Sequence, residues 1–357
     1  MINVPANLKG VRVAVLYGPV SEEDRVYIRN TPHEKWSLTA IMETLTESGI
    51  DAEHLDPTAA DFVERVRTFD VAYVNVHGPW GEDGRLQGLL DYLHVPYTSS
   101  GVLAGGIGAD KLASKAVFKY VGIPTLRDSG LITESAIPAF PMPAMLKAVD
   151  GGSSVGLQRV ETLTEAANAA HRFRERGFRR FFLEEFVVGR AMTVAVLGTP
   201  TGPKALPPLE VLTERDYYDE ETKLGGGDGP AVTYQVPDDL ASATLDAMSF
   251  GALAVYGFLQ CRGAIRIDYM VDTAGVAYAL EVNTTPGVQR HSNLPVAAHA
   301  VGIGYRELIL MLLADAIENG VRPPWALRSL VEQQRGPSPQ LEAALPYIER
   351  ATPDRTE

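Results

Sequence analysis

Apolar residues near the start of the chain form short runs and helical repeats. Residues 11–17 are a nearly continuous apolar run, which is typical of a buried strand. Residues 36–45 carry apolar side chains at helical spacing, and Gly49 marks the end of this predicted helix. The pattern then repeats, with a predicted strand at 71–76 and a short predicted helix at 86–93. This alternation predicts a doubly wound α/β domain, in which ligands bind at the carboxyl ends of the strands.

The rest of the chain divides at proline and glycine. A Gly-Ile-Pro break at 122–124 and a proline-punctuated linker at 136–143 precede the segment 144–200, which alternates strand, loop, helix and strand. That order suits a small α+β lid. We therefore predict an N-terminal α/β domain at 1–123, a central lid at 124–204, a C-terminal domain at 205–320 and a partly ordered tail at 321–357.

The strongest chemical signal is a predicted hairpin in the third domain. Two apolar, β-prone segments flank the turn 272–275. Because side chains alternate along a strand, Arg266 and Asp268 share a face of the first strand. Glu281 and Asn283 share a face of the second for the same reason. Such oxygen donors beside an arginine suit Mg²⁺ ions that bridge nucleotide phosphates, and an amphipathic hairpin with one wet face is the alternative.

Like charges in one site repel each other, so neither carboxylate of this hairpin is expected to stabilise the fold. Alanine at Asp268 or Glu281 is therefore expected to leave the melting temperature near its original value.

Three further segments carry candidate chemistry. Residues 77–84 contain three glycines and two acids, typical of a ligand loop or of a plain turn before a helix capped by Asp83. Residues 147–156 form a glycine- and hydroxyl-rich loop whose N–H groups can wrap phosphate oxygens, with a flexible turn as the alternative. Adjacent acids on a strand face opposite sides, so one of Glu184 and Glu185 is expected to face solvent. The other is a candidate acceptor for an adenine amino group.

Two lysines, Lys111 and Lys115, lie one helical turn apart. Residues four apart on a helix share a face, so both ammonium groups are expected on the same side. Their spacing alone predicts a solvated helix face.

Composition excludes several classes of protein. The chain has 357 residues, enough for about two or three domains, with 45% apolar and 22% charged residues, as in soluble globular proteins. The net charge of -13 argues against nucleic-acid binding. The single cysteine, Cys261, excludes an internal disulfide and favours a reducing cytoplasm. No signal core or apolar run of about 18 residues is present, so we expect no membrane segment.

These motifs, in this order, resemble the D-alanine–D-alanine ligases of the ATP-grasp superfamily. The resemblance runs from residue 11 to residue 320 and rests on segments in family order, namely 77–78, 81–84, 87–88, 96–102, 110–111, 152–156, 193–198 and 281–287. It implies the ATP-grasp fold and a reaction in two steps. ATP phosphorylates the carboxylate of one amino acid, and the amine of a second then displaces phosphate from the acyl phosphate. Positioning and charge neutralisation are the main requirements of phosphoryl transfer.

The resemblance also implies the residues that bind ATP and metal. It places ATP against Lys111, Lys147, Ser153, Ser154, Glu184, Glu185 and Lys223, with Glu184 beside the adenine. It assigns a pair of Mg²⁺ ions, or Mn²⁺ in their place, to Asp268, Glu281 and Asn283.

The implied residues for the amino-acid chemistry lie in other segments. Arg266 and the backbone N–H of Gly287 match the groups that stabilise the tetrahedral oxyanion. Glu23, assisted by His77 and linked to Ser153, matches the acid that holds the ammonium of the first amino acid. Ser292 matches the serine that binds the carboxylate of the second.

Several positions depart from the family pattern. The first loop reads Gly-Pro-Val-Ser at 18–21, Gly151 replaces an acid, and Ala191 replaces a glutamate that serves the ATP ribose. Leu224 stands where a tyrosine usually follows the lysine of the mobile loop, and Asn293 stands where leucine usually follows the serine. The ATP and metal residues are thus retained while the amino-acid pocket is altered.

We therefore expect an ADP-forming ligase that makes a dipeptide of the D-Ala-D-Ala type for peptidoglycan. The alternative is a ligase of specialised metabolism with other amino acids, and a more remote one is a degenerate nucleotide-binding regulator. Small-molecule amino-acid substrates are the expected partners, and the resemblance implies a homodimer.

Overall fold

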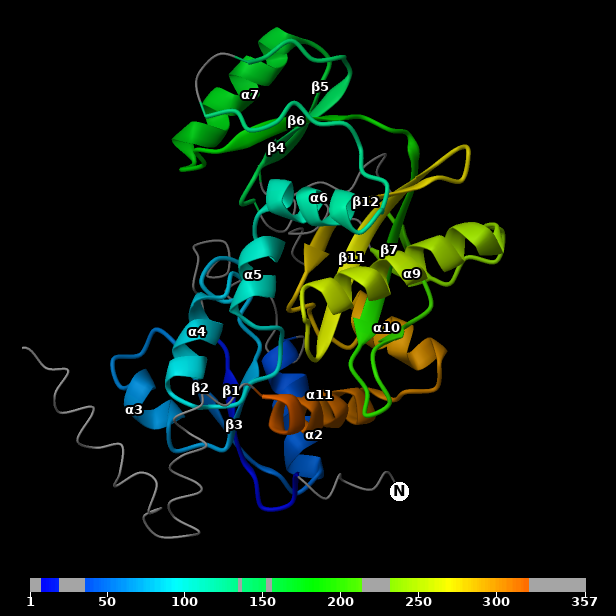
Figure 1. Cartoon of the computed structure of the whole chain (residues 1–357). Helices are drawn as coiled ribbons and strands as arrows, with labels where there is room; N and C mark the ends of the chain where they lie inside the picture. The colour runs from blue at the N-terminus through cyan, green and yellow to red at the C-terminus, as the bar shows by residue number, and fades with distance from the viewer. Residues whose placement is uncertain (1–7, 19–35, 134–136, 152–155, 214–231, 321–357) are drawn as a thin grey trace, which may run out of the picture.

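The structure is a computed structural model that describes residues 8–18, 36–133, 137–151, 156–213 and 232–320. Within these residues the strands form three separate sheets, and helices pack against each of them (Figure 1). The predicted tail after Gly320 lies outside the described residues.

The N-terminal sheet is parallel and has three strands in the order β2-β1-β3. The central strand β1 (Arg12–Leu16) pairs with β2 (Asp51–Leu55) on one side and β3 (Val71–Val74) on the other. Helices pack around it, namely α2 (Ser37–Glu47), α3 (Phe62–Val66) and α4 (Arg85–Tyr92). The predicted first and second strands and both helices are therefore confirmed.

The strand β2 is not evident from the sequence pattern. Its residues, Asp-Ala-Glu-His-Leu, are mostly polar, and only Leu55 is buried. The strand lies at the edge of the sheet, where one side of the ladder is open and polar side chains reach solvent. Its place is therefore set by pairing with β1 rather than by its own apolar content.

The lid is a small antiparallel sheet covered by one helix, at the top of Figure 1. The central strand β4 (Ala144–Ala148) pairs with β5 (Leu157–Val160) and β6 (Phe181–Glu185). The helix α7 (Leu163–Glu175) begins after Thr162, whose side chain accepts a hydrogen bond from the backbone N–H of Glu165. The α+β character expected of this segment is confirmed.

The largest sheet follows the order β10-β9-β7-β11-β12, with the short strand β8 beside β7. Its strands are β7 (Gly189–Leu197), β8 (Lys204–Ala205), β9 (Leu209–Leu212), β10 (Thr233–Gln235), β11 (Ala264–Asp272) and β12 (Ala277–Asn283). The chain thus leaves the lid sheet at Glu185 and enters the largest sheet at Gly189, upstream of the division predicted at residue 204. The sequence does not reveal this because β6 and β7 are both apolar strands, and only their partners differ.

One face of the largest sheet is apolar and the other carries the candidate chemistry. Along β11, Ile265 and Ile267 are fully buried in a cluster with Met248 and Val255 of helix α9 (Ser242–Phe258). The intervening residues of β11 are only partly buried. The alternation that predicted a two-faced strand is therefore observed, and α9 covers the apolar face.

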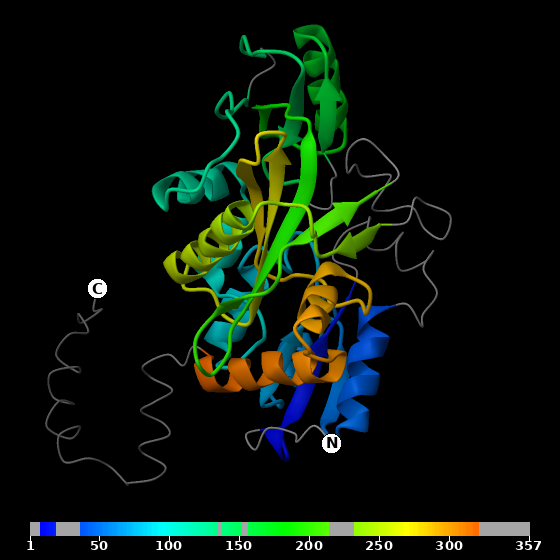
Figure 2. The ribbon, with the colours of Figure 1, turned by 90° about the vertical axis from the view of Figure 1, so that its right-hand side faces the viewer.

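The helices α10 (Asn293–Ala300) and α11 (Tyr305–Asn319) join the C-terminal part of the chain to the N-terminal sheet. Leu308 and Leu313 of α11 lie in one buried cluster with Val13 and Tyr73 of the N-terminal sheet. Figure 2 shows α11 lying across the base of the molecule beside α2. Two segments distant in sequence therefore share one core.

Among the described residues, no single helix is long and apolar enough to cross a membrane. The helices α10 and α11 meet that test only as a pair, and they are bent by 105° against each other.

Leu313 should be essential to this shared core. Its side chain is fully buried, so Leu313→Ala is expected to lower the free energy of unfolding by about 2–5 kcal/mol through lost contacts and a cavity. The exposed Leu103 is the matched control, and its alanine variant should change that free energy by less than about 0.5 kcal/mol. Urea denaturation measures both, and equal effects would contradict the shared core.

Candidate active site

The β11–β12 hairpin brings the predicted polar residues together. In the register of the two strands, Arg266 is opposite Asn283 and Asp268 is opposite Glu281. Residues directly opposite in an antiparallel ladder share a face, so all four side chains converge beside one another. A register shift follows Asp268, and such irregularities are frequent next to active sites. The predicted convergence is confirmed.

Arg266 and Asp268 form a two-pronged ion pair along the strand. The guanidinium Nε lies 2.8 Å from Oδ1 of Asp268, and Nη2 lies 2.9 Å from Oδ2. Thr193 of the adjacent strand β7 donates a third hydrogen bond to Oδ1 at 2.7 Å. Burial by itself lowers the pKa of Arg266, but attraction to Asp268 and Glu281 outweighs burial and raises it. Arg266 therefore stays charged and oriented at any ordinary pH.

Lys111 connects this hairpin to the glycine-rich loop. Its ammonium Nζ lies 3.0 Å from Oε2 of Glu281 and also donates to the carbonyl oxygen of Gly151. Lys111 is the first residue of helix α6 (Lys111–Tyr120), and its backbone N–H donates to the carbonyl of Val149, just after β4. The start of α6 is thereby bonded to the lid, and the predicted phosphate lysine lies beside a predicted metal carboxylate.

A second charged cluster joins strands β4 and β6 of the lid to helix α6. Glu184 is fully buried and its carboxylate accepts hydrogen bonds from two ammonium groups. Lys115 donates to Oε1 at 2.6 Å, and Lys147 donates to Oε2. Glu185, the next residue, is exposed, which confirms that the two acids face opposite sides.

The prediction of a solvated lysine face on α6 is wrong. The side chains of Lys111 and Lys115 are only 17% and 1% exposed, because this face of the helix packs between the lid and the hairpin. Helical spacing shows that two residues share a face, but it does not show whether that face is buried. The sequence does not reveal the contacts of Lys115 with Glu184 and of Thr193 with Asp268, because each carboxylate is distant in sequence. The burial of Lys115 has one local indication. Its neighbours on the helix, Ser114 and Phe118, are both buried as well.

The loop after β3 approaches the loop after β12. Nδ1 of His77 lies 3.3 Å from Oε1 of Glu82, and the buried Nε2 has no hydrogen-bond partner among the described residues. Cε1 of His77 would lie 3.9 Å from a Cβ placed on Gly287, and Oε1 of Gln289 would lie only 2.8 Å from it. A side chain at Gly287 would therefore displace the flexible end of Gln289, whereas its distance from His77 would be that of an ordinary van der Waals contact.

Ser292 and Asn293 begin helix α10. The hydroxyl of Ser292 shares its one hydrogen between the carbonyl oxygens of Gly287 and Gln289, each 2.8 Å from Oγ. Asn293 is largely buried, and its side-chain oxygen accepts a hydrogen bond from the backbone N–H of Leu294 at 2.8 Å. Ser292 thus holds the turn that carries Gly287, while Asn293 adds a polar group where an apolar one was expected from the family pattern.

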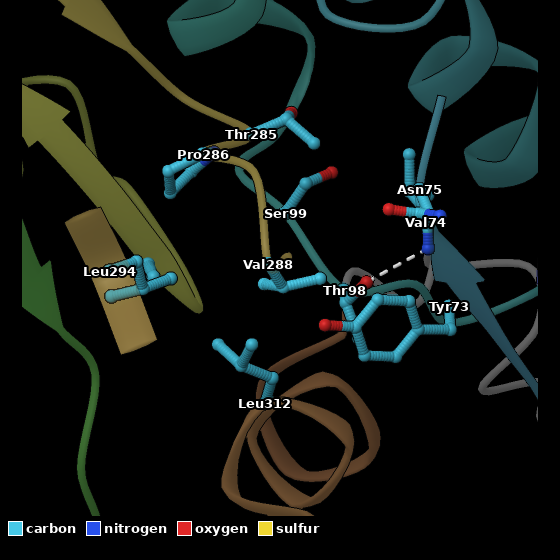
Figure 3. Close-up of a pocket in the computed structure, with 11 residues that line it drawn as sticks. Tyr73, Val74, Asn75, Thr98, Ser99, Thr285, Pro286, Val288, Leu294 and Leu312 are labelled. Carbon is cyan, nitrogen blue, oxygen red and sulfur yellow. Dashed lines mark hydrogen bonds between the residues drawn. The ribbon is translucent and has the colours of Figure 1, made fainter. Parts of the chain in front are cut away.

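A small cavity lies where the N-terminal sheet meets this turn (Figure 3). The buried Oδ1 of Asn75 and Oγ1 of Thr285 both line it and have no hydrogen-bond partner among the described residues. Asn75 follows the carboxyl end of β3, the position predicted to face ligands.

Five predicted site residues cannot be placed, since they lie outside the described part of the chain, namely Glu23, Ser153, Ser154, Lys223 and Leu224. The described site residues form three neighbouring groups. These are the hairpin with Lys111, the buried pair of Lys147 and Glu184, and His77 with the turn from Gly287 to Asn293.

The oxygen atoms offered by the hairpin suit a hard divalent cation such as Mg²⁺. Within the described residues, no three or more His, Cys, Asp or Glu side chains group closely enough to hold an ion by themselves. Asp268, Glu281 and Asn283 offer two carboxylates and one amide, all with hard oxygen atoms. Mg²⁺ is commonly bound by one or two carboxylates together with substrate phosphates, so these residues fit Mg²⁺ held jointly with a nucleotide.

Comparison with known proteins points to one family. A protein-family model described as the D-ala D-ala ligase C-terminus matches residues 118–314, and one for the N-terminus matches residues 24–100. A D-alanine–D-alanine ligase of Alcanivorax borkumensis is 38% identical over 312 residues, covering 87% of this chain and 95% of that protein. The ligase of Albidiferax ferrireducens is 35% identical over 311 residues, covering 85% of this chain and 87% of that protein.

A solved structure shares the architecture as well. The D-alanine–D-alanine ligase from Bacillus anthracis complexed with ATP is 26% identical, with a TM-score of 0.71, covering 87% of this chain and 98% of that one. The fold and the charged hairpin define an ATP-grasp enzyme, an ATP-dependent and ADP-forming ligase that joins a carboxylate to an amine. The chain belongs to the D-alanine–D-alanine ligase family.

The ion pairs of the hairpin predict unequal effects on stability, in place of the expectation from sequence that neither carboxylate stabilises the fold. Asp268→Ala leaves the largely buried Arg266 without its partner and should lower the free energy of unfolding by about 1–3 kcal/mol. Glu281 is one-third exposed, so Glu281→Ala should cost less than about 1 kcal/mol. Thermal and urea denaturation of both variants test this. A melting temperature of Asp268→Ala equal to that of the unsubstituted protein would show that the ion pair contributes nothing.

Proposed function

We propose that this ligase activates one amino acid as an acyl phosphate and couples it to the amine of a second, giving a dipeptide of the D-Ala-D-Ala type. The observation that carries the proposal is the convergence of Arg266, Asp268, Glu281 and Asn283 on one face of the hairpin, with Lys111 beside them. These side chains offer cations for phosphate and hard oxygen donors for metal within a single site. Family membership supplies the reaction class.

The nucleotide is proposed to lie between the lid and the hairpin. Lys111 and Lys147 would bind its phosphates, aided by Ser153, Ser154 and Lys223 of the loops outside the described residues. Glu184 and Glu185 would lie at the adenine end. Asp268, Glu281 and Asn283 would hold a pair of Mg²⁺ ions, or Mn²⁺, which when bound would neutralise the charge of the transferred phosphoryl group.

Arg266 is proposed to stabilise the tetrahedral oxyanion together with the backbone N–H of Gly287. Two observations support this role. Asp268 and Thr193 fix the guanidinium in place, so no reorganisation is needed when charge develops. Ser292 fixes the carbonyl of Gly287, which orients the turn that carries the N–H group.

The amino acids are proposed to lie at the junction with the N-terminal sheet. Glu23 and His77 would hold the ammonium of the first substrate, linked to Ser153. Nε2 of His77, which has no hydrogen-bond partner within the described part of the chain, supports this. Ser292 would bind the carboxylate of the second substrate. Both substrates would then meet beside Gly287, where the loops after β3 and β12 approach each other.

A specific observation favours a second candidate, a ligase of specialised metabolism with a different second substrate. Asn293 places a buried amide next to Ser292, and Leu224 lacks the hydroxyl of the usual tyrosine. Both changes alter the part of the site that would select the second substrate. We further propose a cytoplasmic homodimer, since the reaction consumes ATP and members of this family form dimers.

The metal carboxylates should be required for turnover. Glu281→Ala and Asp268→Ala are each expected to reduce turnover to below a few per cent, because both remove a hard oxygen donor from the phosphoryl-transfer site. ADP release in the presence of amino acids measures this at a temperature where each variant is folded. Substantial activity in either variant would overturn the metal assignment. If the unsubstituted protein bound ATP but released no ADP with any amino-acid pair, the protein would instead be the degenerate regulator.

Arg266 should act on the transition state more than on nucleotide binding. Losing one preorganised donor at an oxyanion costs about 3–4 kcal/mol, or roughly 10²–10³-fold in rate. Arg266→Met should therefore lower kcat by that factor while the Kd for ATP stays within several-fold. Steady-state kinetics and equilibrium ATP titration give the two values. Normal kcat with lost ATP binding would assign the arginine to the nucleotide.

The altered pocket should show in substrate choice. With Leu224 in place of tyrosine, one loop hydrogen bond is lost, worth about 1 kcal/mol, or about 3 if it leaves a charged partner unpaired. Phosphate release is measured for D-alanine alone and for D-alanine mixed with other D- and L-amino acids or hydroxy acids. We expect a mixture to give a higher kcat/KM than D-alanine alone, and Leu224→Tyr to shift the preference toward D-alanine. If D-alanine alone gives the highest value and Leu224→Tyr changes nothing, the enzyme is a plain D-alanine–D-alanine ligase.

A further inference from the structure

Five charged side chains of alternating sign form a line from the surface of α6 to β4. Lys119 is exposed, and its Nζ lies 3.2 Å from Oδ2 of Asp128. The same Oδ2 lies 3.8 Å from Nζ of Lys115, which in turn lies 2.6 Å from Oε1 of Glu184. The other oxygen of Glu184 accepts from Lys147. The line is therefore positive, negative, positive, negative and positive, ending at a proposed phosphate ligand.

Lys115 is the buried centre of this line. Its side chain is only 1% exposed, and its ammonium also donates to the carbonyl of Leu126 at 2.6 Å. A buried ammonium is stable only when it is paired and hydrogen-bonded, and Lys115 has a carboxylate and a carbonyl within reach. It therefore joins three segments, namely α6, the linker at Leu126 and β6.

The pairing of Lys115 with Glu184 also affects Lys147. Glu184 carries one negative charge and is shared by two ammonium groups, so Lys115 neutralises much of the attraction that would otherwise hold Lys147. A phosphate oxygen competing for the ammonium of Lys147 then has less carboxylate attraction to overcome. Without Lys115, Glu184 and Lys147 would form an exclusive buried ion pair, and such a pair is strongly held at low dielectric.

We propose that Lys115 is a positioning residue for nucleotide binding, which keeps Lys147 available to phosphate by sharing Glu184 with it. This inference rests on the proposed role of Lys147 as a phosphate ligand. Lys115 itself contacts no phosphate in this scheme and acts only through the carboxylate. If Lys115 only joined α6 to the lid, its substitution would instead lower the stability of the protein and weaken the binding of ATP and adenosine equally.

The test compares binding of ATP with binding of adenosine, which has no phosphate. Lys115→Met should raise the Kd for ATP about tenfold or more, as expected when a hydrogen bond between charged groups is weakened. The Kd for adenosine should stay within about twofold, because Glu184 keeps its place at the adenine end, held by Lys147, and only the phosphate ligand is withdrawn. Equilibrium titration gives both constants, and the melting temperature without nucleotide shows whether the variant is folded.

Glu184 supplies the decisive comparison. If Lys115 acts through that carboxylate, adding Lys115→Met to Glu184→Gln should change the Kd for ATP by less than about threefold, against tenfold or more in the unsubstituted background.

Lys119→Met is the matched control one turn further along α6, since Lys119 is 60% exposed and contacts only Asp128 in this line. Its Kd for ATP should stay within about twofold. If Lys115→Met is not folded at the assay temperature, Lys115→Gln, which retains a donor, replaces it in every arm.

The outcomes separate the two levels of inference. Equal losses of ATP and adenosine binding, or additive effects of Lys115→Met and Glu184→Gln, would overturn the positioning role and leave a structural one. An unchanged Kd for ATP in Lys115→Met would overturn it as well. Failure of the unsubstituted protein to bind ATP would instead overturn the proposed nucleotide site, whatever the variants do.

Discussion

The register of the β11–β12 ladder is the constraint on which the site depends. Pairing Arg266 with Asn283 and Asp268 with Glu281 puts four polar side chains on the face opposite helix α9. A slip of one residue would turn these side chains toward the apolar cluster of α9 and turn Ile265 and Ile267 outward. The same burial that stabilises the sheet therefore fixes the geometry of the chemistry. Neither can change without the other.

Charge compensation is the second organising feature of this protein. Within the described residues, each cation proposed to meet phosphate or oxyanion already has a carboxylate partner, in the pairs Lys111 with Glu281, Arg266 with Asp268 and Lys147 with Glu184. A metal–nucleotide complex carries both signs, so it can supply a cation to the carboxylates and phosphate oxygens to the lysines. Binding would then exchange the partners of Lys111 and Lys147 rather than bury bare charges, which would be costly in a low-dielectric site, while the pair of Arg266 and Asp268 stays in place.

Connections between distant segments hold these pairs in place. Lys111 and Lys115 lie one turn apart on α6, yet one reaches the hairpin of the largest sheet and the other reaches β6 of the lid. The helix thus links the sheets on either side of the proposed nucleotide position. In the same way, Leu313 of α11 and Val13 of β1 share a core, so the turn at Gly287 is held against the N-terminal sheet.

The sequence by itself determined the features that depend on local periodicity. Alternation predicted the two faces of the hairpin and the opposite orientations of Glu184 and Glu185, and continuous apolar runs predicted β1 and β3. Only the tertiary structure decided the features that depend on a distant partner. The segment β2 is a strand because it pairs with β1. The strand β7 belongs to the largest sheet because it pairs with β11. The burial of Lys115 is likewise decided by Glu184, 69 residues away, because helical spacing fixes which residues share a face but not what that face meets.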